Sequence, residues 1–230
     1  WLGGYDGGFI PFAAEDIEES IPVSAGCPFR CNFCQTGWVG ARSAAMDTTG
    51  LLDCALRIRT ATACADINLL TSDAASLKGM PELVARLQAR CIRVSMKSLT
   101  VAGLAGDPEM RGLAGRIGKR EFTLGVDGIS ARLRAYLGKN FETGLLLDLV
   151  RDLDSRGLRQ LKLFFILTGL EETEDTTELA GLIRSVRKNA PKCGLVASFT
   201  PLFHAPFTPL QFDRIRNVDY EMSRLCLEAV

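Results

Sequence analysis

Residues 24–38 read SAGCPFRCNFCQTGW and follow directly on a predicted β-strand at Ser20–Val23. The stretch places Cys27, Cys31 and Cys34 in the spacing C-x3-C-x2-C. A loop this short lets three thiols point toward one centre, whereas structural zinc and electron-transfer 4Fe–4S clusters each take four protein ligands. Three cysteines on a four-iron cluster leave one iron with an open coordination position. The spacing therefore favours an open metal centre over a closed one.

The chain holds eight cysteines and a single histidine, His204. Disulfide frameworks are typical of chains much shorter than 230 residues, so the cysteine content favours a reducing compartment and thiolate chemistry. A zinc site completed by His204 is the alternative, although that residue lies at the far end of the chain. The other five cysteines fall mostly at apolar positions and are expected to pack as small hydrophobic residues: Cys54, Cys64, Cys91, Cys193 and Cys226.

The composition excludes some classes of protein. The 27 Lys and Arg residues equal the 27 Asp and Glu residues, so no basic field is available to hold nucleic acid by charge alone. No apolar run reaches the roughly 18 residues of a membrane helix, and no signal-peptide pattern opens the chain. We expect a cytoplasmic protein with no membrane partner. Because the chain opens on Trp1 in a Gly-rich stretch, we interpret residues 1–19 as an entry segment and residues 20–230 as one core domain of a longer protein.

Short β-rich runs alternate with amphipathic helical stretches along the whole chain. This order predicts an α/β protein with a parallel sheet, because parallel neighbours need crossover connections. The predicted strands are Ser20–Val23, Asp66–Leu70, Ile92–Met96, Glu121–Val126, Leu161–Leu167 and Gly194–Thr200. The predicted helices are Thr49–Thr60, Pro81–Arg90, Pro108–Ile117, Ile129–Tyr136 continuing through Thr143–Arg156, and Thr173–Lys188.

Side-chain alternation distinguishes a curved sheet from an open, doubly wound one. In the third predicted strand, Val94 lies on an apolar face, whereas Ser95 and Lys97 belong to a polar face. A doubly wound sheet covers both faces with helices and needs nearly continuous apolar strands. We therefore expect helices on the convex side and a solvated, ligand-holding concave side, although the strand Leu161–Leu167 is apolar nearly throughout.

The loop also resembles the signature of the radical S-adenosylmethionine (SAM) superfamily, C-x3-C-x-aromatic-C after the first strand. Cys27, Cys31, Phe33 and Cys34 match it. The resemblance implies a partial (βα)6 TIM barrel, with a six-stranded parallel sheet and helices on its outer face. It also implies a 4Fe–4S cluster whose open iron binds SAM. One electron then cleaves SAM to a 5'-deoxyadenosyl radical, which abstracts hydrogen from an unactivated carbon.

Longer stretches, among them GCPFRCNFCQTGW at 26–38 and LGVDGISARLRAYLGKN at 124–140, are similar to the cobalamin-binding branch and the related methylthiotransferase-type branch of this superfamily. This similarity implies cobalamin bound by a domain outside the chain, methyl transfer to the substrate carbon, and an electron donor such as flavodoxin or ferredoxin. Methylthiolation of RNA or protein is one alternative. A non-enzymatic iron–sulfur or zinc module is another. The substrate stays open between a small molecule, a peptide and RNA.

The resemblance also implies contacts to SAM. The backbone of Phe33 is expected near the adenine. Ser72 and Asp73 stand where many family members have a Gly-Gly-Glu-like motif for the methionine amino group, so they are expected to substitute for it in part. Ser95 and Lys97 are expected to face SAM or substrate.

The fourth predicted strand and the helix after it carry two further candidates. Asp127 is similar to a ribose-binding acid, although an acid at this place also suits a helix N-terminus. Arg134 resembles the arginine that pairs with the SAM carboxylate, where the guanidinium fork suits the geometry. Farther along, Gly169 and Glu172 resemble a Gly-x-x-Glu element, and no role is assigned to His204.

Overall fold

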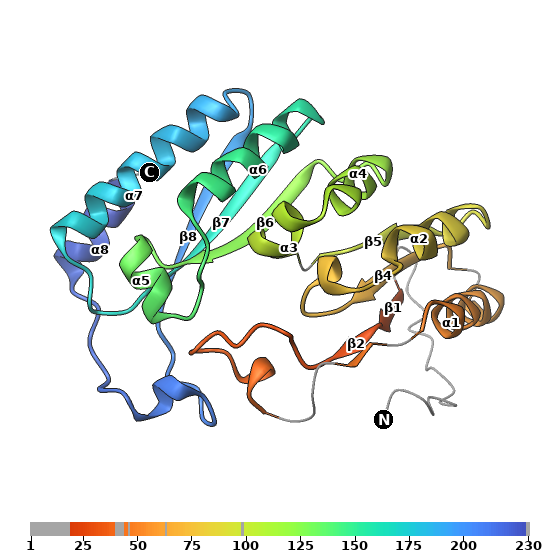
Figure 1. Ribbon diagram of the computed structural model, residues 1–230, viewed down its shortest axis with the longest axis horizontal. Helices are drawn as coiled ribbons and strands as arrows, with labels where there is room; N and C mark the ends of the chain where they lie inside the picture. The colour runs from red at the N-terminus through yellow and green to blue at the C-terminus, as the bar shows by residue number, and fades with distance from the viewer. Residues whose placement is uncertain (1–18, 40–43, 46, 63, 98, 229–230) are drawn as a thin grey trace.

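The computed structural model describes residues 19–39, 44–45, 47–62, 64–97 and 99–228 (Figure 1). The predicted entry segment lies outside these residues except for Glu19. The parallel strands are β1 (Glu19–Pro22), β4 (Asp66–Leu70), β5 (Arg93–Ser95), β6 (Glu121–Asp127), β7 (Gln160–Leu167) and β8 (Gly194–Pro201). A short antiparallel pair joins β2 (Ser24–Ala25) to β3 (Ala44–Ala45).

The helices alternate with the parallel strands, as the sequence pattern predicts. They are α1 (Thr48–Thr62), α2 (Met80–Gln88), α3 (Val101–Gly106), α4 (Pro108–Arg116), α5 (Ala131–Tyr136), α6 (Thr143–Ser155), α7 (Thr173–Asn189) and α8 (Tyr220–Glu228). Short 3₁₀ turns occur at η1 (Gln35–Gly37), η2 (Ala74–Ser76) and η3 (Pro209–Phe212). The sequence did not predict α3, whose residues VAGLAG include two glycines that weaken a helix.

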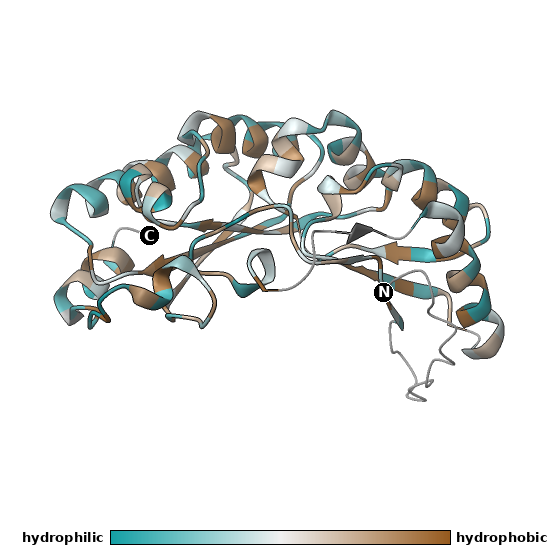
Figure 2. Ribbon diagram, turned by 60° about the horizontal axis from the view of Figure 1, so that its bottom comes forward, coloured by the Kyte–Doolittle hydropathy of each residue, from teal (hydrophilic) through white to brown (hydrophobic). Residues whose placement is uncertain are grey.

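The six predicted strands form two sheets of three, in the orders β1-β4-β5 and β6-β7-β8. Among the described residues no ladder joins β5 to β6, so one continuous six-stranded sheet is not confirmed. β5 spans only three residues and therefore offers β6 a short edge. Figure 2 shows both sheets in one arc, with most of the helices along its outer side. This arrangement is the predicted α/β architecture with parallel strands and helices on a convex face.

The alternation of buried side chains along β7 shows that the second sheet has one dry face. In β7, Leu161, Leu163 and Phe165 are fully buried, whereas Lys162 and Phe164 between them are half-buried. Although β7 is apolar nearly throughout, it therefore has one fully buried face and one face that is only partly covered. The dry face packs under α6, whose buried residues recur at helical spacing: Leu146, Leu149, Val150 and Leu153.

Among the residues that the structure describes, no helix combines the length and the apolar character that a membrane crossing requires.

Candidate functional site

The cysteine loop, residues 26–38, lies near the middle of the arc, along the edge at which the parallel strands finish (Figure 1). It folds tightly on itself. The carbonyl of Cys31 accepts hydrogen bonds from the backbone N–H of Cys34 at 3.2 Å and from Nε1 of Trp38 at 2.8 Å. A Cβ at Gly37 would lie 2.3 Å from the carbonyl oxygen of Phe29, so this turn requires glycine. The tight turn keeps the cysteines close together.

The three thiols of the loop are free and interact electrostatically. Cys31 is buried, and Cys27 and Cys34 are half-buried. Burial raises the pKa of both Cys27 and Cys31, and the charge of Cys34 raises the pKa of both further. The nearby ammonium of Lys139 lowers both pKa values in part. A bound metal would therefore have to displace protons from this loop.

The donor set fits an open iron–sulfur site in kind and in number. Three free cysteines on one loop supply thiolate ligands, and no fourth ligand is needed when one iron stays open to a small molecule. Across the described part of the chain, no three His, Cys, Asp or Glu side chains are gathered as in a formed metal site, so binding of a cluster has to complete the arrangement. His204 likewise completes no such group with the cysteines there, and the zinc alternative gains no support.

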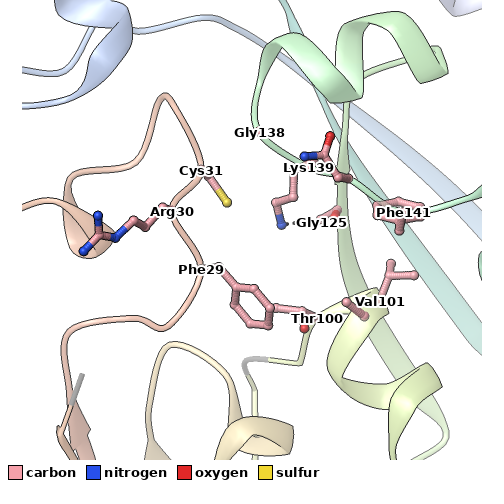
Figure 3. Close-up of a pocket in the computed structure, with 11 residues that line it drawn as sticks. Phe29, Arg30, Cys31, Thr100, Val101, Gly125, Gly138, Lys139 and Phe141 are labelled. Carbon is pink, nitrogen blue, oxygen red and sulfur yellow. Dashed lines mark hydrogen bonds between the residues drawn. The ribbon is translucent and has the colours of Figure 1, made fainter. Parts of the chain in front are cut away.

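A pocket of about 210 Å³ lies beside Cys31 (Figure 3). Figure 3 shows the thiol of Cys31 and the ammonium of Lys139 pointing into the same space, with the rings of Phe29 and Phe141 beside it. The pocket thus combines a thiol, a cation and aromatic faces. Its lining consists of Phe29, Arg30, Cys31, Thr100, Val101, Ala102, Gly125, Gly138, Lys139, Asn140 and Phe141.

Lys139 is held over the end of β6 by an ion pair with a predicted site residue. Its Nζ lies 2.9 Å from Oδ2 of Asp127 and donates to the carbonyl of Gly125 at 3.5 Å. The strand register shifts between Gly125 and Asp127, and Asp127 has a φ of +64°, which turns its carboxylate out of the strand pattern. Burial by itself lowers the pKa of Lys139, but the charge and hydrogen bond of Asp127, together with the charges of Cys31 and Cys27, outweigh burial and raise it. Lys139 is therefore a cation at neutral pH.

Lys139 was not predicted as a site residue, although it lies in LGKN, the last four residues of the similar stretch 124–140. The feature of the sequence that could have indicated its position is the glycine directly before it. Gly138 has a φ of +73°, the left-handed conformation that ends a helix and redirects the chain.

The predicted substitutes for the methionine-binding motif lie next to the cysteine loop. Ser72 Oγ donates to the carbonyl of Gly26 at 2.9 Å, one residue before the first cysteine. Asp73 is buried, and its carboxylate accepts from the N–H of Thr100 at 2.9 Å and from Ser76 Oγ at 2.6 Å. The structure therefore brings both residues to the loop but already uses the carboxylate of Asp73 to hold the turn after β4.

Ser95 belongs to a polar row across the first sheet. Ser95 Oγ donates to Oδ1 of Asn68 at 3.2 Å, and Nδ2 of Asn68 donates to Ser20 Oγ at 3.2 Å. Lys97 is exposed just past β5. Neither Ser95 nor Lys97 is among the residues that line the pocket, and Phe33 is half-buried within the loop.

Arg134 is buried and does not line the pocket, although it contacts Phe141, which does. Its NH2 group donates to Thr143 Oγ1 at 2.7 Å and lies 3.6 Å from Oε1 of Glu178. Its guanidinium stacks over the ring of Phe141, with 5.2 Å from its Cζ to the ring centroid. Burial lowers the pKa of Arg134, and Glu178 opposes that effect. Its predicted pairing with the SAM carboxylate stays a prediction.

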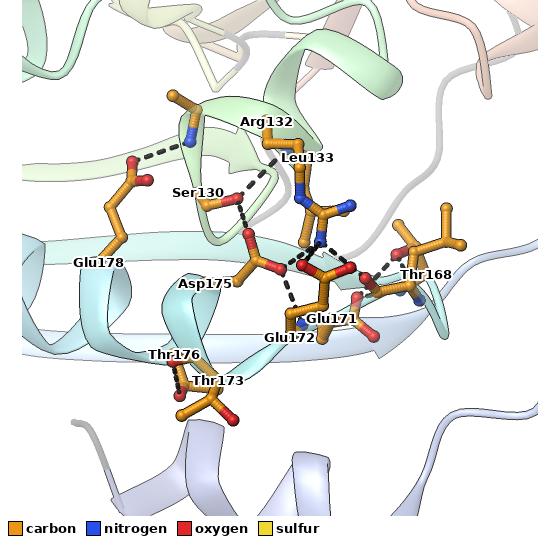
Figure 4. A network of polar contacts seen from close by, with 12 residues as sticks. Ser130, Arg132, Leu133, Thr168, Glu171, Glu172, Thr173, Asp175, Thr176 and Glu178 are labelled. Carbon is orange, nitrogen blue, oxygen red and sulfur yellow. Dashed lines mark hydrogen bonds and ion pairs between the residues drawn. The ribbon is translucent and has the colours of Figure 1, made fainter.

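A buried network fixes α5 against α7 (Figure 4). The carboxylate of Asp175 accepts from Ser130 Oγ at 2.5 Å, from Arg132 and from the N–H of Glu172 at 2.8 Å. Burial raises the pKa of Asp175, but these hydrogen bonds outweigh burial and lower it. Glu172 caps α7, as an acid at a helix start should. The Gly-x-x-Glu element thus has a structural role here.

Comparison with solved structures identifies the fold. The chain superposes on the radical S-adenosylmethionine methyltransferase TsrM from Kitasatospora setae, solved with cobalamin and a 4Fe–4S cluster, with a TM-score of 0.64 and 20% identity over 84% of this chain and 38% of that one. It superposes on the cobalamin-dependent SAM radical enzyme OxsB with a TM-score of 0.63 and 12% identity over 84% of this chain and 34% of that one. It superposes on SuiB from Streptococcus suis, solved with its precursor peptide SuiA, with a TM-score of 0.59 and 13% identity over 92% of this chain and 44% of that one.

The chain therefore has the α/β fold of these structural neighbours, of which TsrM and OxsB are radical SAM enzymes, and it spans less than half the length of each of the three. No protein-family model and no curated protein sequence matches it.

Proposed function

We propose that residues 20–230 are the core domain of a radical SAM enzyme. The observation that carries this proposal is the pocket where the thiol of Cys31 and the ammonium of Lys139 meet, beside the cysteine loop of a fold shared with radical SAM enzymes. We further propose that the two sheets together act as one six-stranded partial (βα)6 TIM barrel. Function in barrels of this kind lies at the C-terminal ends of the strands, where the loop is found.

Cys27, Cys31 and Cys34 would hold a 4Fe–4S cluster through three thiolates and leave one iron for SAM. When bound, such a cluster supplies the electron that cleaves SAM to a 5'-deoxyadenosyl radical, which takes hydrogen from an unactivated carbon. The residues around the loop bind and orient SAM.

Lys139 is the cation best placed for the SAM carboxylate, because it points into the pocket beside Cys31. The other cation of the lining, Arg30, is exposed and lies over the ring of Trp38, and Arg134 does not line the pocket. An ammonium that donates to Asp127 and to the carbonyl of Gly125 keeps one further N–H for a second anion. Asp127 itself is proposed to accept from the ribose hydroxyls.

The remaining contacts follow the predicted positions. Ser72 and Asp73 would approach the methionine amino group from the turn after β4, and the backbone of Phe33 would approach the adenine. Ser95 and Lys97, which lie outside the pocket lining, would contact the substrate on the concave face.

The proposed reaction is a methyl transfer that uses cobalamin from a domain outside this chain. TsrM and OxsB, both described as cobalamin-bound radical SAM proteins, support this choice. The substrate is a small molecule or a peptide, as the tryptophan of one TsrM structure and the precursor peptide of SuiB suggest. Flavodoxin or ferredoxin would supply the electron in the cytoplasm. Methylthiolation of RNA receives less support, since the chain carries no net positive charge.

Anaerobic reconstitution with iron and sulfide, followed by dithionite and SAM, tests the proposal. Wild-type protein is expected to bind a 4Fe–4S cluster and release 5'-deoxyadenosine. Cys31→Ala should lose both cluster and product. Cys54→Ala, which alters a half-buried cysteine of α1 outside the loop, should retain both. A wild-type protein that holds the cluster but forms no 5'-deoxyadenosine contradicts the proposed function.

A further inference from the structure

Asn32, which lies between two of the proposed cluster ligands, is hydrogen-bonded to two other segments of the chain. Its backbone N–H donates to the carbonyl of Leu137 at 2.9 Å, and its side-chain Nδ2 donates to the carbonyl of Tyr136 at 2.8 Å. Its own carbonyl accepts from the N–H of Leu210 at 3.2 Å. One residue therefore connects the cysteine loop to the end of α5 and to the start of η3.

The two carbonyls that Asn32 binds lie at the C-terminal end of α5. The last carbonyls of a helix have no partner inside the helix and need one from elsewhere. The chain leaves α5 through Gly138, where an added Cβ would lie 3.0 Å from the backbone nitrogen of Asn32 and 3.2 Å from its Cγ. The helix end is thus shaped to receive Asn32 in particular.

The partner of Asn32 is itself fixed in place. At its N-terminal end, α5 is joined to α7 through the buried hydrogen bond from Ser130 to Asp175 (Figure 4). At its C-terminal end, the hydroxyl of Tyr136 donates to Asp213, which follows η3 directly. A loop attached here is therefore attached to a rigid part of the fold.

The cysteine loop depends on such an attachment. Between Cys27 and Cys34 it contains no helix or strand, and η1 begins only at Gln35. Ordering an irregular segment costs conformational entropy for every residue that is fixed. Hydrogen bonds from outside the loop have to offset that cost.

We propose that Asn32 is a positioning residue for the cluster site: its amide fixes the turn from Cys31 to Cys34 against the end of α5, so that the thiols stay beside the pocket. That the loop holds an iron–sulfur cluster rests on the proposed function. The attachment of the loop by Asn32 does not depend on it and can be measured without a cluster.

The test compares Asn32→Asp with Asn189→Asp. The first change keeps the size of the side chain, removes its N–H donor and places a carboxylate against the carbonyl of Tyr136. The second makes the same change in α7, where Nδ2 of Asn189 donates to the carbonyl of Ser185 at 2.8 Å, away from the loop. Asn32→Ala removes the donor without adding charge and serves if the aspartate variant does not fold.

In the cluster-free protein, hydrogen exchange of a peptide that covers residues 28–38 is expected to be about tenfold faster in Asn32→Asp than in wild type. Exchange of β7 and α7 should not change. In reconstituted protein, an iron chelator should remove iron about tenfold faster from Asn32→Asp, and the EPR signal of the reduced cluster should broaden. Asn189→Asp should match wild type in all three measurements.

If the loop exchanges hydrogen at the wild-type rate in both Asn32→Asp and Asn32→Ala, the inference is overturned, regardless of the results on the cluster. Faster loop exchange with unchanged iron release and an unchanged EPR signal would overturn the role at the cluster. If no protein, wild type included, binds a cluster, the proposed function fails and the exchange measurement alone decides whether Asn32 holds the loop.

Discussion

Replacement of Lys139 with Met should weaken SAM binding selectively. Methionine has a similar length but carries no charge, so the change removes the ammonium that lines the pocket. That ammonium lies 2.9 Å from Asp127, and 18% of the lysine side chain is exposed, so its interactions are only partly screened by water. A hydrogen bond to a charged group contributes about 1.5–3 kcal/mol. The dissociation constant for SAM should therefore rise about 10- to 150-fold.

The assay is anaerobic equilibrium dialysis of reconstituted protein with SAM and with decarboxylated SAM. If Lys139 pairs with the carboxylate, the variant should bind decarboxylated SAM within about threefold of wild type, because the missing group is the one that Lys139 contacts. Lys139→Arg keeps the charge and should recover most of the affinity for SAM. Lys162→Met removes a half-buried lysine of β7 that does not line the pocket, and it should bind both ligands as wild type does.

Two results would refute the reasoning. An equal loss of affinity for both ligands would mean that Lys139 acts through Asp127, whose buried carboxylate loses its ion-pair partner in the variant. Wild-type affinity for SAM would mean that the carboxylate binds elsewhere, and Arg134→Met would then be measured in the same way. The melting temperature of each variant separates a binding effect from loss of fold.

Three further predictions concern the loop, the helix network and pH. Gly37→Ala should lower the iron content, because the added Cβ meets a backbone carbonyl at 2.3 Å, whereas Gly181→Ala in α7 meets nothing within 4 Å and should leave it unchanged. Asp175→Ala should lower the free energy of unfolding in urea by about 1.5–3 kcal/mol, because the buried hydroxyl of Ser130 and the N–H of Glu172 lose a charged acceptor. The exposed Asp148→Ala should cost less than about 1 kcal/mol, and equal effects would contradict the network. The Tyr136 hydroxyl and then Arg216 hold the pKa of Asp213 at about 2, below its usual value, so its contribution to stability is present above about pH 4 and is lost as the pH falls toward 2. Urea unfolding of cluster-free Asp213→Asn should lack that part of the acid dependence.

The strands could be predicted from the sequence because their alternation has a period of two, and every predicted strand lies within about two residues of the observed one. The cysteine loop could be predicted because its three cysteines lie within eight residues. Which strands pair with one another could not be predicted from the local sequence. β5 and β6 are each recognisable as strands, but the absence of a ladder between them in the described chain leaves no mark in either segment.

The site around the loop could be predicted only in part. Lys139 was missed because its place depends on the turn at Gly138 directly before it and also on two distant features, the shift in register before Asp127 and the approach of the loop. Arg134 and Arg132 lie two residues apart on a short helix, where successive side chains point about 100° apart. Which of them turns inward depends on α6 and α7, and burial places Arg134 inside. The local sequence does not contain that information.

The cysteine loop also affects the arc as a whole, because it is hydrogen-bonded to segments that follow strands of both three-stranded sheets. Its first part accepts from Ser72 after β4, and its middle part is attached to the end of α5 after β6. It therefore spans the junction between the two sheets, where no ladder joins the described strands β5 and β6. A ligand that binds only the folded loop stabilises whatever the loop connects. Binding of a ligand at this site should consequently stiffen the junction between the two sheets. Motions of the sheets relative to each other, far from the thiols, should then decrease when the site is occupied.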